Sequence, residues 1–187
     1  MIDENLFPLL KAQVDGKELI IGPKKIKENS RNGNSYNLQP TKFKVITNSR
    51  EIKELNVVSS GDFIIASPIN IGKLEINMAG SGNILLEKKV EGNKLEINLA
   101  SSGSVVASNI DLAGIECSLA GSGYIQIAGK ADRAEYNLAA SGNIKAYECV
   151  TGKTECNIAG SGNIQTHTRN QLEANIVGSG NVYYKGN

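Results

Sequence analysis

A Ser-Gly pair recurs seven times from residue 60 onward, and this repeat constrains the fold more than any other feature of the chain. Successive pairs are 21, 21, 20, 19, 20 and 18 residues apart, so one structural unit of about 20 residues repeats. The pairs are Ser60-Gly61, Ser81-Gly82, Ser102-Gly103, Ser122-Gly123, Ser141-Gly142, Ser161-Gly162 and Ser179-Gly180.

Each copy has the pattern of a strand, a corner and a second strand. In the fullest copy, LEINMAGSGNI, apolar residues occupy every second position from Leu74 to Met78, which is typical of a half-buried strand. The small residues of 79–83 predict a corner, and Ile84 begins a second short strand. A variable return segment then leads to the next copy.

These units predict an all-β fold, a parallel β-helix (solenoid) of about seven regular coils. Coils stacked as neighbouring strands lie roughly 4.8 Å apart. A leucine-rich repeat needs an LxxLxLxxN spacing that is absent, and a propeller blade needs about 40 residues or more. An antiparallel sandwich would not place the same residue at the same phase seven times.

Stacking converts sequence positions into columns of side chains, two of which are predicted to line the core. Cys117 and Cys156 share one of them at a separation of two coils, roughly 9–10 Å, which is too far for a disulfide. Buried thiols acting as small core residues are the expected interpretation. The first column is Val57, Met78, Leu99, Leu119, Leu138, Ile158 and Ile176, and the second is Leu55, Ile76, Ile97, Cys117, Tyr136, Cys156 and Ala174.

An outward column, one residue before the second core column, is glutamate in all seven copies. Like charges on adjacent strands repel, so we expect neighbouring residues to offset the repulsion. A solvated face with stacked amide hydrogen bonds, a cation- or glycan-binding face and a set of catalytic carboxylates are the three interpretations. The column is Glu54, Glu75, Glu96, Glu116, Glu135, Glu155 and Glu173; Lys73, Lys94, Arg133 and Lys153 stand two residues earlier, and Asn56, Asn77, Asn98, Ser118, Asn137, Asn157 and Asn175 two residues later.

The corner residues have a structural explanation. Glycine there permits either a positive φ or a close approach of backbones, and stacked serine hydroxyls can bond along the ladder. A phosphate-binding loop is disfavoured, because such a loop opens a helix whereas strands flank each Ser-Gly pair.

The two ends of the chain differ from the repeats. Residues 1–52 are expected to form irregular N-terminal coils within a single domain, 1–187. An Asp15-Gly16 turn is predicted between two strand-like runs of 12–21, with a basic loop over 22–41 that carries Lys24, Lys25, Lys27 and Arg31. No distinct cap follows the seventh corner, which predicts cover by another subunit, making a homo-oligomer through the terminal coil, or a longer native chain.

Composition excludes several classes of protein. A net charge of +1 argues against a nucleic-acid partner. Three cysteines without a CxxC spacing predict neither a disulfide framework nor a zinc site, and we expect no metal or cofactor. No segment reaches the length of a membrane span. MIDENLFPLLKAQ lacks signal-peptide features, so the protein is either cytoplasmic or begins after a removed signal.

The repeated LEINxAGSGNI blocks and the segment DENLFPLLKAQVDGKELIIG resemble the auto-transporter adhesin head GIN domain family of Bacteroidetes. The resemblance covers most of the chain. It implies a right-handed parallel β-helix, a location in the periplasm, at the cell surface or outside the cell, and no established catalysis.

Three functions are compatible with these features. The first is a non-catalytic surface or envelope module, an adhesin or scaffold that binds a glycan or a surface protein through its repetitive polar face. The second is a carbohydrate-active lyase or hydrolase, which would need two carboxylates in different environments. The third is an assembly unit that stacks through its terminal coils. An adhesin is expected to show exposed aromatic residues near Tyr124, Tyr147, Tyr183 and Tyr184.

Overall fold

The computed structural model describes residues 10–15, 18–23, 51–58 and 60–186. The chain divides into two compact units, Met1–Asn48 and Ser49–Asn187. In the first, β1 (Leu10–Asp15) and β2 (Glu18–Pro23) pair antiparallel with Asp15 opposite Glu18. The predicted Asp15-Gly16 turn extends into residues 16–17, which lie outside the described residues. The rest of the basic loop beyond Pro23 lies outside the described residues, and the single domain over 1–187 stays a prediction.

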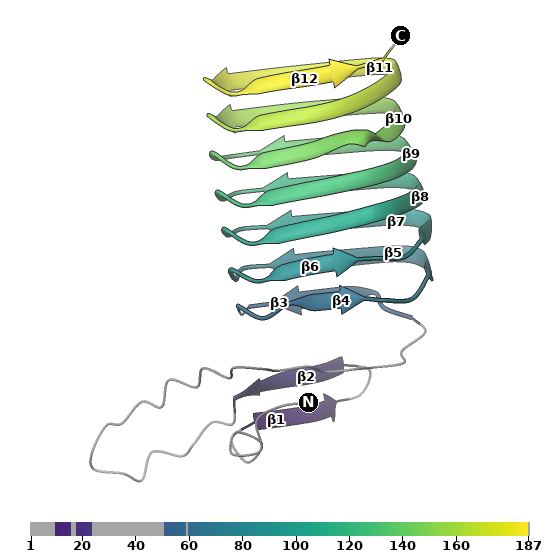
Figure 1. The fold of residues 1–187 in the computed structure, drawn as a ribbon, viewed down its shortest axis with the longest axis vertical. Helices are drawn as coiled ribbons and strands as arrows, with labels where there is room; N and C mark the ends of the chain where they lie inside the picture. The colour runs from purple at the N-terminus through teal and green to yellow at the C-terminus, as the bar shows by residue number, and fades with distance from the viewer. Residues whose placement is uncertain (1–9, 16–17, 24–50, 59, 187) are drawn as a thin grey trace, which may run out of the picture. The chain divides into compact units, whose positions relative to one another are not determined.

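The second unit is a solenoid of parallel strands, as predicted. Figure 1 shows the chain running along the near side through β4 and β6 and returning along the far side through β5 and β7 while it advances, which makes the coil right-handed. The described residues contain no helix that could span a membrane. The strands are β3 (Glu54–Val57), β4 (Phe63–Ile65), β5 (Ile69–Met78), β6 (Asn83–Leu86), β7 (Val90–Leu99), β8 (Ser104–Leu119), β9 (Tyr124–Leu138), β10 (Asn143–Gly160), β11 (Asn163–Gly178) and β12 (Asn181–Lys185).

The register of the strands confirms both predicted core columns. Met78 lies opposite Val57 and Leu99, and Tyr136 lies opposite Cys117 and Cys156. Most members of the two columns are buried. Ile176 belongs to its column by register but is 45% exposed, because no described coil covers the outer side of this last one. Ala174 is exposed for the same reason.

The core becomes polar in β10 and β11. Thr151 and Thr154 form a buried hydroxyl–hydroxyl hydrogen bond of 2.6 Å, and Thr168 donates to Thr154 at 2.7 Å. Thr151 also donates to the backbone oxygen of His167 at 2.9 Å. The burial of these hydroxyls is tolerated because they are hydrogen-bonded to one another. The alternating pattern alone did not predict this network.

The corner glycines explain why the Ser-Gly pair recurs. A Cβ atom placed on any of six of them would lie 2.0–2.5 Å from the carbonyl oxygen of the corresponding glycine in the preceding coil. Close approach of backbones, and not a positive φ, therefore requires these glycines; the positive φ values occur at Gly92, Gly129, Gly160 and Gly178 instead. The paired serines are exposed, and their hydroxyls form no ladder among the described residues. The six glycines are Gly82, Gly103, Gly123, Gly142, Gly162 and Gly180.

Candidate functional site

Three outward columns run side by side along one face of the solenoid. The carboxylate column holds the seven glutamates, and every neighbouring pair of them is in register. The amide column is Asn56, Asn77, Asn98, Ser118, Asn137, Asn157 and Asn175, and the cation column is Lys73, Lys94, Gly114, Arg133, Lys153 and Gln171.

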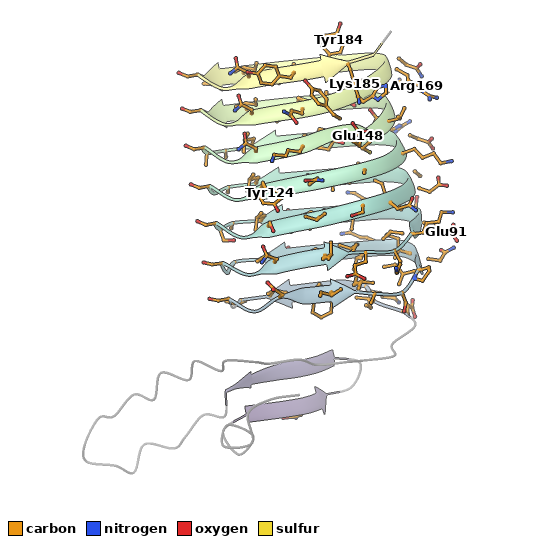
Figure 2. The ribbon with its side chains drawn as sticks, in the orientation of Figure 1. Glu91, Tyr124, Glu148, Arg169, Tyr184 and Lys185 are labelled. Carbon is orange, nitrogen blue, oxygen red and sulfur yellow. The ribbon has the colours of Figure 1, made fainter. Side chains whose placement is uncertain are left out.

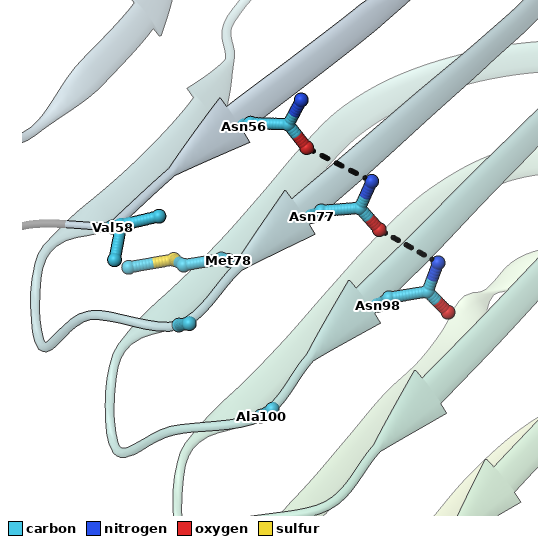
Figure 3. Close-up of a pocket in the computed structure, with 7 residues that line it drawn as sticks. Asn56, Val58, Asn77, Met78, Asn98 and Ala100 are labelled. Carbon is cyan, nitrogen blue, oxygen red and sulfur yellow. Dashed lines mark hydrogen bonds between the residues drawn. The ribbon is translucent and has the colours of Figure 1, made fainter.

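The amide column is joined by hydrogen bonds from coil to coil. The Nδ2 of Asn77 donates to the Oδ1 of Asn56 at 3.0 Å, and the Nδ2 of Asn98 donates to the Oδ1 of Asn77 at 2.9 Å (Figure 3). Asn157 and Asn175 continue the pattern at 3.0 Å each, after Ser118 has interrupted it. The predicted stacked amide bonds are therefore present, in two runs.

The amides also bind the carboxylate column. Asn77, Asn137 and Asn157 each donate to the glutamate two residues before them, at 3.0, 2.9 and 3.0 Å. Each such glutamate thus accepts a hydrogen bond even where no cation pairs with it. These bonds partly offset the repulsion between stacked carboxylates.

In the coils of β5 and β7, lysines of the cation column form ion pairs with the carboxylate column. Lys73 lies 3.2 Å from Glu75 and 3.0 Å from Glu96, and Lys94 lies 2.8 Å from Glu116. Hydrogen bonds from Asn77 and Lys73 lower the pKa of Glu75, and the bond from Lys73 lowers the pKa of Glu96. The bonds to Glu96 and Glu75 raise the pKa of Lys73.

These shifts predict a defined dependence of stability on pH. Because the pKa of Glu75 and Glu96 is lowered from 4.5, their contribution is complete above 4.5 and is lost as pH falls through the folded value. We expect the melting temperature to fall on acidification, and to fall less in Lys73→Gln, which lacks the bridging ammonium. Thermal melts between about pH 6 and pH 3 measure this difference. Parallel curves for the two proteins would contradict it.

The cation column is interrupted at β8. Gly114 occupies the position opposite Lys94 and Arg133 and contributes no side chain. Within the described part of the chain, neither Arg133 nor Lys153 forms an ion pair or a side-chain hydrogen bond. The sequence pattern identified the four cations but not the difference between the paired and unpaired ones.

Two hollows lie on this face. The first, which we call the charged hollow, has a volume of about 520 Å³ and spans the interrupted part of the cation column. It is lined by Lys94, Gly114, Ile115, Glu116, Arg133, Ala134, Glu135, Lys153, Thr154, Glu155, Gln171 and Glu173. The second, of about 200 Å³, is lined by Asn56, Val58, Asn77, Met78, Ala79, Asn98 and Ala100 (Figure 3).

Three of the four tyrosines expected of an adhesin are exposed, and the fourth, Tyr147, is half-buried. Tyr124, Tyr183 and Tyr184 are 38%, 48% and 61% exposed, and Figure 2 places Tyr124 and Tyr184 on different coils. The Nζ of Lys145 lies 5.1 Å from the Tyr124 ring centre, and that of Lys185 lies 5.5 Å from the Tyr147 ring centre. These cations sit over aromatic faces and are thereby held in place.

The described groups with shifted pKa values differ from a general acid and from an activated thiol. The pKa of Glu75 and of Glu96 is lowered, which is opposite to the shift that a general acid requires. Burial raises the pKa of Cys149 to about 11 and of Cys156 to about 12, so these thiols are poor nucleophiles. Among the residues described, no group of three or more His, Cys, Asp or Glu is arranged to hold a metal ion.

Known proteins resemble the chain over its whole length. The model of the family described as "Putative auto-transporter adhesin, head GIN domain" matches residues 1–91 and 80–187. A solved "putative lipid binding protein" from Parabacteroides distasonis is 46% identical, with a TM-score of 0.88 over 98% of this chain and 82% of that one. A "putative adhesin" from Parabacteroides merdae is 34% identical, with a TM-score of 0.85 over 100% of this chain and 74% of that one.

A second "putative adhesin", from Parabacteroides distasonis, is 26% identical, with a TM-score of 0.83 over 98% of this chain and 82% of that one. No curated protein matches. The fold built from the repeat is therefore shared with experimentally determined structures.

Proposed function

The chain belongs to the auto-transporter adhesin head GIN domain family, and we propose that it is a non-catalytic binding module of the cell surface or envelope. The glycan-binding interpretation of its polar face is the one that we adopt. The binding residues in this proposal are those of the carboxylate column together with Asn77, Asn98, Asn137 and Asn157.

The repetition of one polar face in successive coils carries this proposal. Carboxylates accept hydrogen bonds, and amides both donate and accept them, so the two columns match the hydroxyl groups of a saccharide. A row of equivalent positions spaced by one coil suits an extended ligand that itself repeats. Glycoside hydrolysis, in contrast, needs two carboxylates in different environments at one place.

The expected result is that the protein binds a polysaccharide and that this binding depends on the polar face. In Glu155→Ala/Asn157→Ala we expect affinity to fall at least tenfold, about 1.4 kcal/mol, because a carboxylate acceptor is lost together with the amide that orients it. Gln126→Ala/Lys145→Ala, which removes two exposed side chains elsewhere on the solenoid, is the matched control. A glycan array followed by calorimetry measures both variants, and circular dichroism checks their folding.

Two outcomes would contradict the proposal. If the protein bound none of the glycans on the array, the proposed glycan-binding function would be wrong. Equal losses in the variant and in its control would show that the polar face is not the binding surface.

Lipid binding is the second candidate, because one solved relative is described as a putative lipid binding protein. Three outward aliphatic side chains, Ile64, Leu85 and Val106, stack in register on β4, β6 and β8. Ile64 is 54% exposed. This stripe would contact an acyl chain, and vesicle flotation distinguishes it from the glycan proposal. Self-association through the terminal coil stays a prediction, consistent with the 74% exposure of Val177.

A further inference from the structure

We propose that the charged hollow binds the carboxylate group of a sparsely charged acidic glycan, through Arg133 and Lys153. This inference rests on the proposed glycan-binding function and specifies the ligand class and the subsite. The ligand class is a polysaccharide with about one carboxylate per disaccharide and free hydroxyl groups elsewhere.

The position of Gly114 creates the subsite. It lies in register between Lys94 and Arg133, where a side chain would otherwise continue the cation column. A Cβ atom added to Gly114 would meet nothing within 4 Å, so the space above it is open. The hollow of about 520 Å³ extends from this opening across the following coils.

The two cations beside this opening are available to a ligand. Lys73 and Lys94 differ from them, because each forms ion pairs with one glutamate of its own coil and one of the next coil. Their positive charges are therefore neutralised within the protein. Arg133 and Lys153 are exposed, lie opposite each other on β9 and β10, and form no ion pair with any described residue. Adjacent strands place them about 4.8 Å apart, so that one carboxylate can contact both.

The neighbouring glutamates are hydrogen-bonded to amides and form no ion pair with these two cations. Glu135 and Glu155 accept hydrogen bonds from Asn137 and Asn157. This arrangement leaves a row of cations beside a row of hydrogen-bonded carboxylates. A sugar carboxylate would contact the first row, and adjacent hydroxyls would donate to the second.

The same glutamates restrict how much negative charge a ligand can carry. The hollow is lined by three cations, Lys94, Arg133 and Lys153, and by four glutamates, so its net charge is −1. A densely sulfated chain would place anionic groups against the carboxylate column and be repelled. A chain with widely spaced carboxylates avoids this repulsion. The site thus selects acidic glycans of low charge density.

Hyaluronan, heparin and dextran test the inference as sparsely charged, densely charged and neutral probes. At about 0.15 M salt we expect the intact protein to bind hyaluronan at least tenfold more tightly than dextran or heparin. Arg133→Gln/Lys153→Gln is expected to lose this preference by at least tenfold. Lys145→Gln/Lys185→Gln, which removes two positive charges located over tyrosine rings, should retain it.

Gly114→Gln is a second variant, and we expect it to fold. The open space accepts the side chain, so the melting temperature is expected to be unchanged or higher, while hyaluronan affinity falls as the opening is filled. Equal binding of hyaluronan and dextran would overturn the inference and leave the proposed function intact. Tighter binding of heparin, or unchanged hyaluronan binding in Arg133→Gln/Lys153→Gln, would also overturn it. Failure of all glycans on the array would contradict the proposed function itself.

Discussion

Replacement of Gly123 by alanine is expected to destabilise the solenoid by about 3 kcal/mol or more, and to prevent folding if the coils cannot separate. The new Cβ atom would lie 2.1 Å from the carbonyl oxygen of Gly103 and 3.0 Å from that of Ser101. Both contacts are with backbone atoms, which cannot rotate away. The amide of Tyr124 donates to the same Gly103 oxygen at 3.2 Å, so relief of the clash would weaken a bond between coils.

Gly114→Ala is the matched control for this substitution. Its Cβ atom would meet nothing within 4 Å, and Gly114 has no positive φ, so the free energy of unfolding should change by less than about 0.5 kcal/mol. Urea denaturation of the three proteins, followed by circular dichroism, measures the difference. If Gly123→Ala were as stable as Gly114→Ala, close packing of the corners could not explain the repeated glycine.

Truncation of Tyr136 to alanine is expected to cost about 3–5 kcal/mol, the second large effect. Tyr136 is fully buried and has the largest volume among the fully buried side chains. It lies in register between Cys117 and Cys156, both fully buried, so small side chains flank it on each side in the core. Its removal would leave a cavity that neither cysteine can fill.

Tyr136→Phe separates the packing of the ring from the effect of its hydroxyl. The hydroxyl forms no hydrogen bond of standard geometry with the described residues, although it interacts with the Cys149 thiol. Burial raises its pKa well above 10.0, so it stays neutral. We expect Tyr136→Phe to be neutral or to stabilise by up to about 1 kcal/mol. Destabilisation of a similar size in denaturant titrations would show that the contact with Cys149 is favourable.

The fold could be predicted from sequence because two periods act together. Alternation at period 2 fixes which side chains point inward, and the spacing of about 20 residues fixes which of them stack. These two constraints placed Glu75 opposite Glu96 and Tyr136 opposite Cys117, as the structure confirms. Neither constraint depends on the conformations of individual side chains.

The charged hollow could not be predicted in the same way. The column position of Arg133 follows from the repeat, but its lack of an ion pair depends on the conformation of its side chain, which the repeat does not determine. The two explanations for the corner glycines also remained open until the distance between backbones was known. Which residues bind a ligand stays a prediction, because stacking determines where a side chain lies and not what it contacts.

The amide column gives the solenoid a direction that its repeating shape does not. Every bond between two asparagines in it points the same way, from the Nδ2 of a later coil to the Oδ1 of an earlier one. Outside this column, Asn163 and Asn181 follow the same rule on β11 and β12. The bond dipoles therefore add along the axis, and the last described coil presents acceptor oxygens. A strand added there in the same orientation would extend the series, whereas an inverted copy would set oxygen against oxygen. The direction of the amide hydrogen bonds therefore makes the two ends of the stack chemically different.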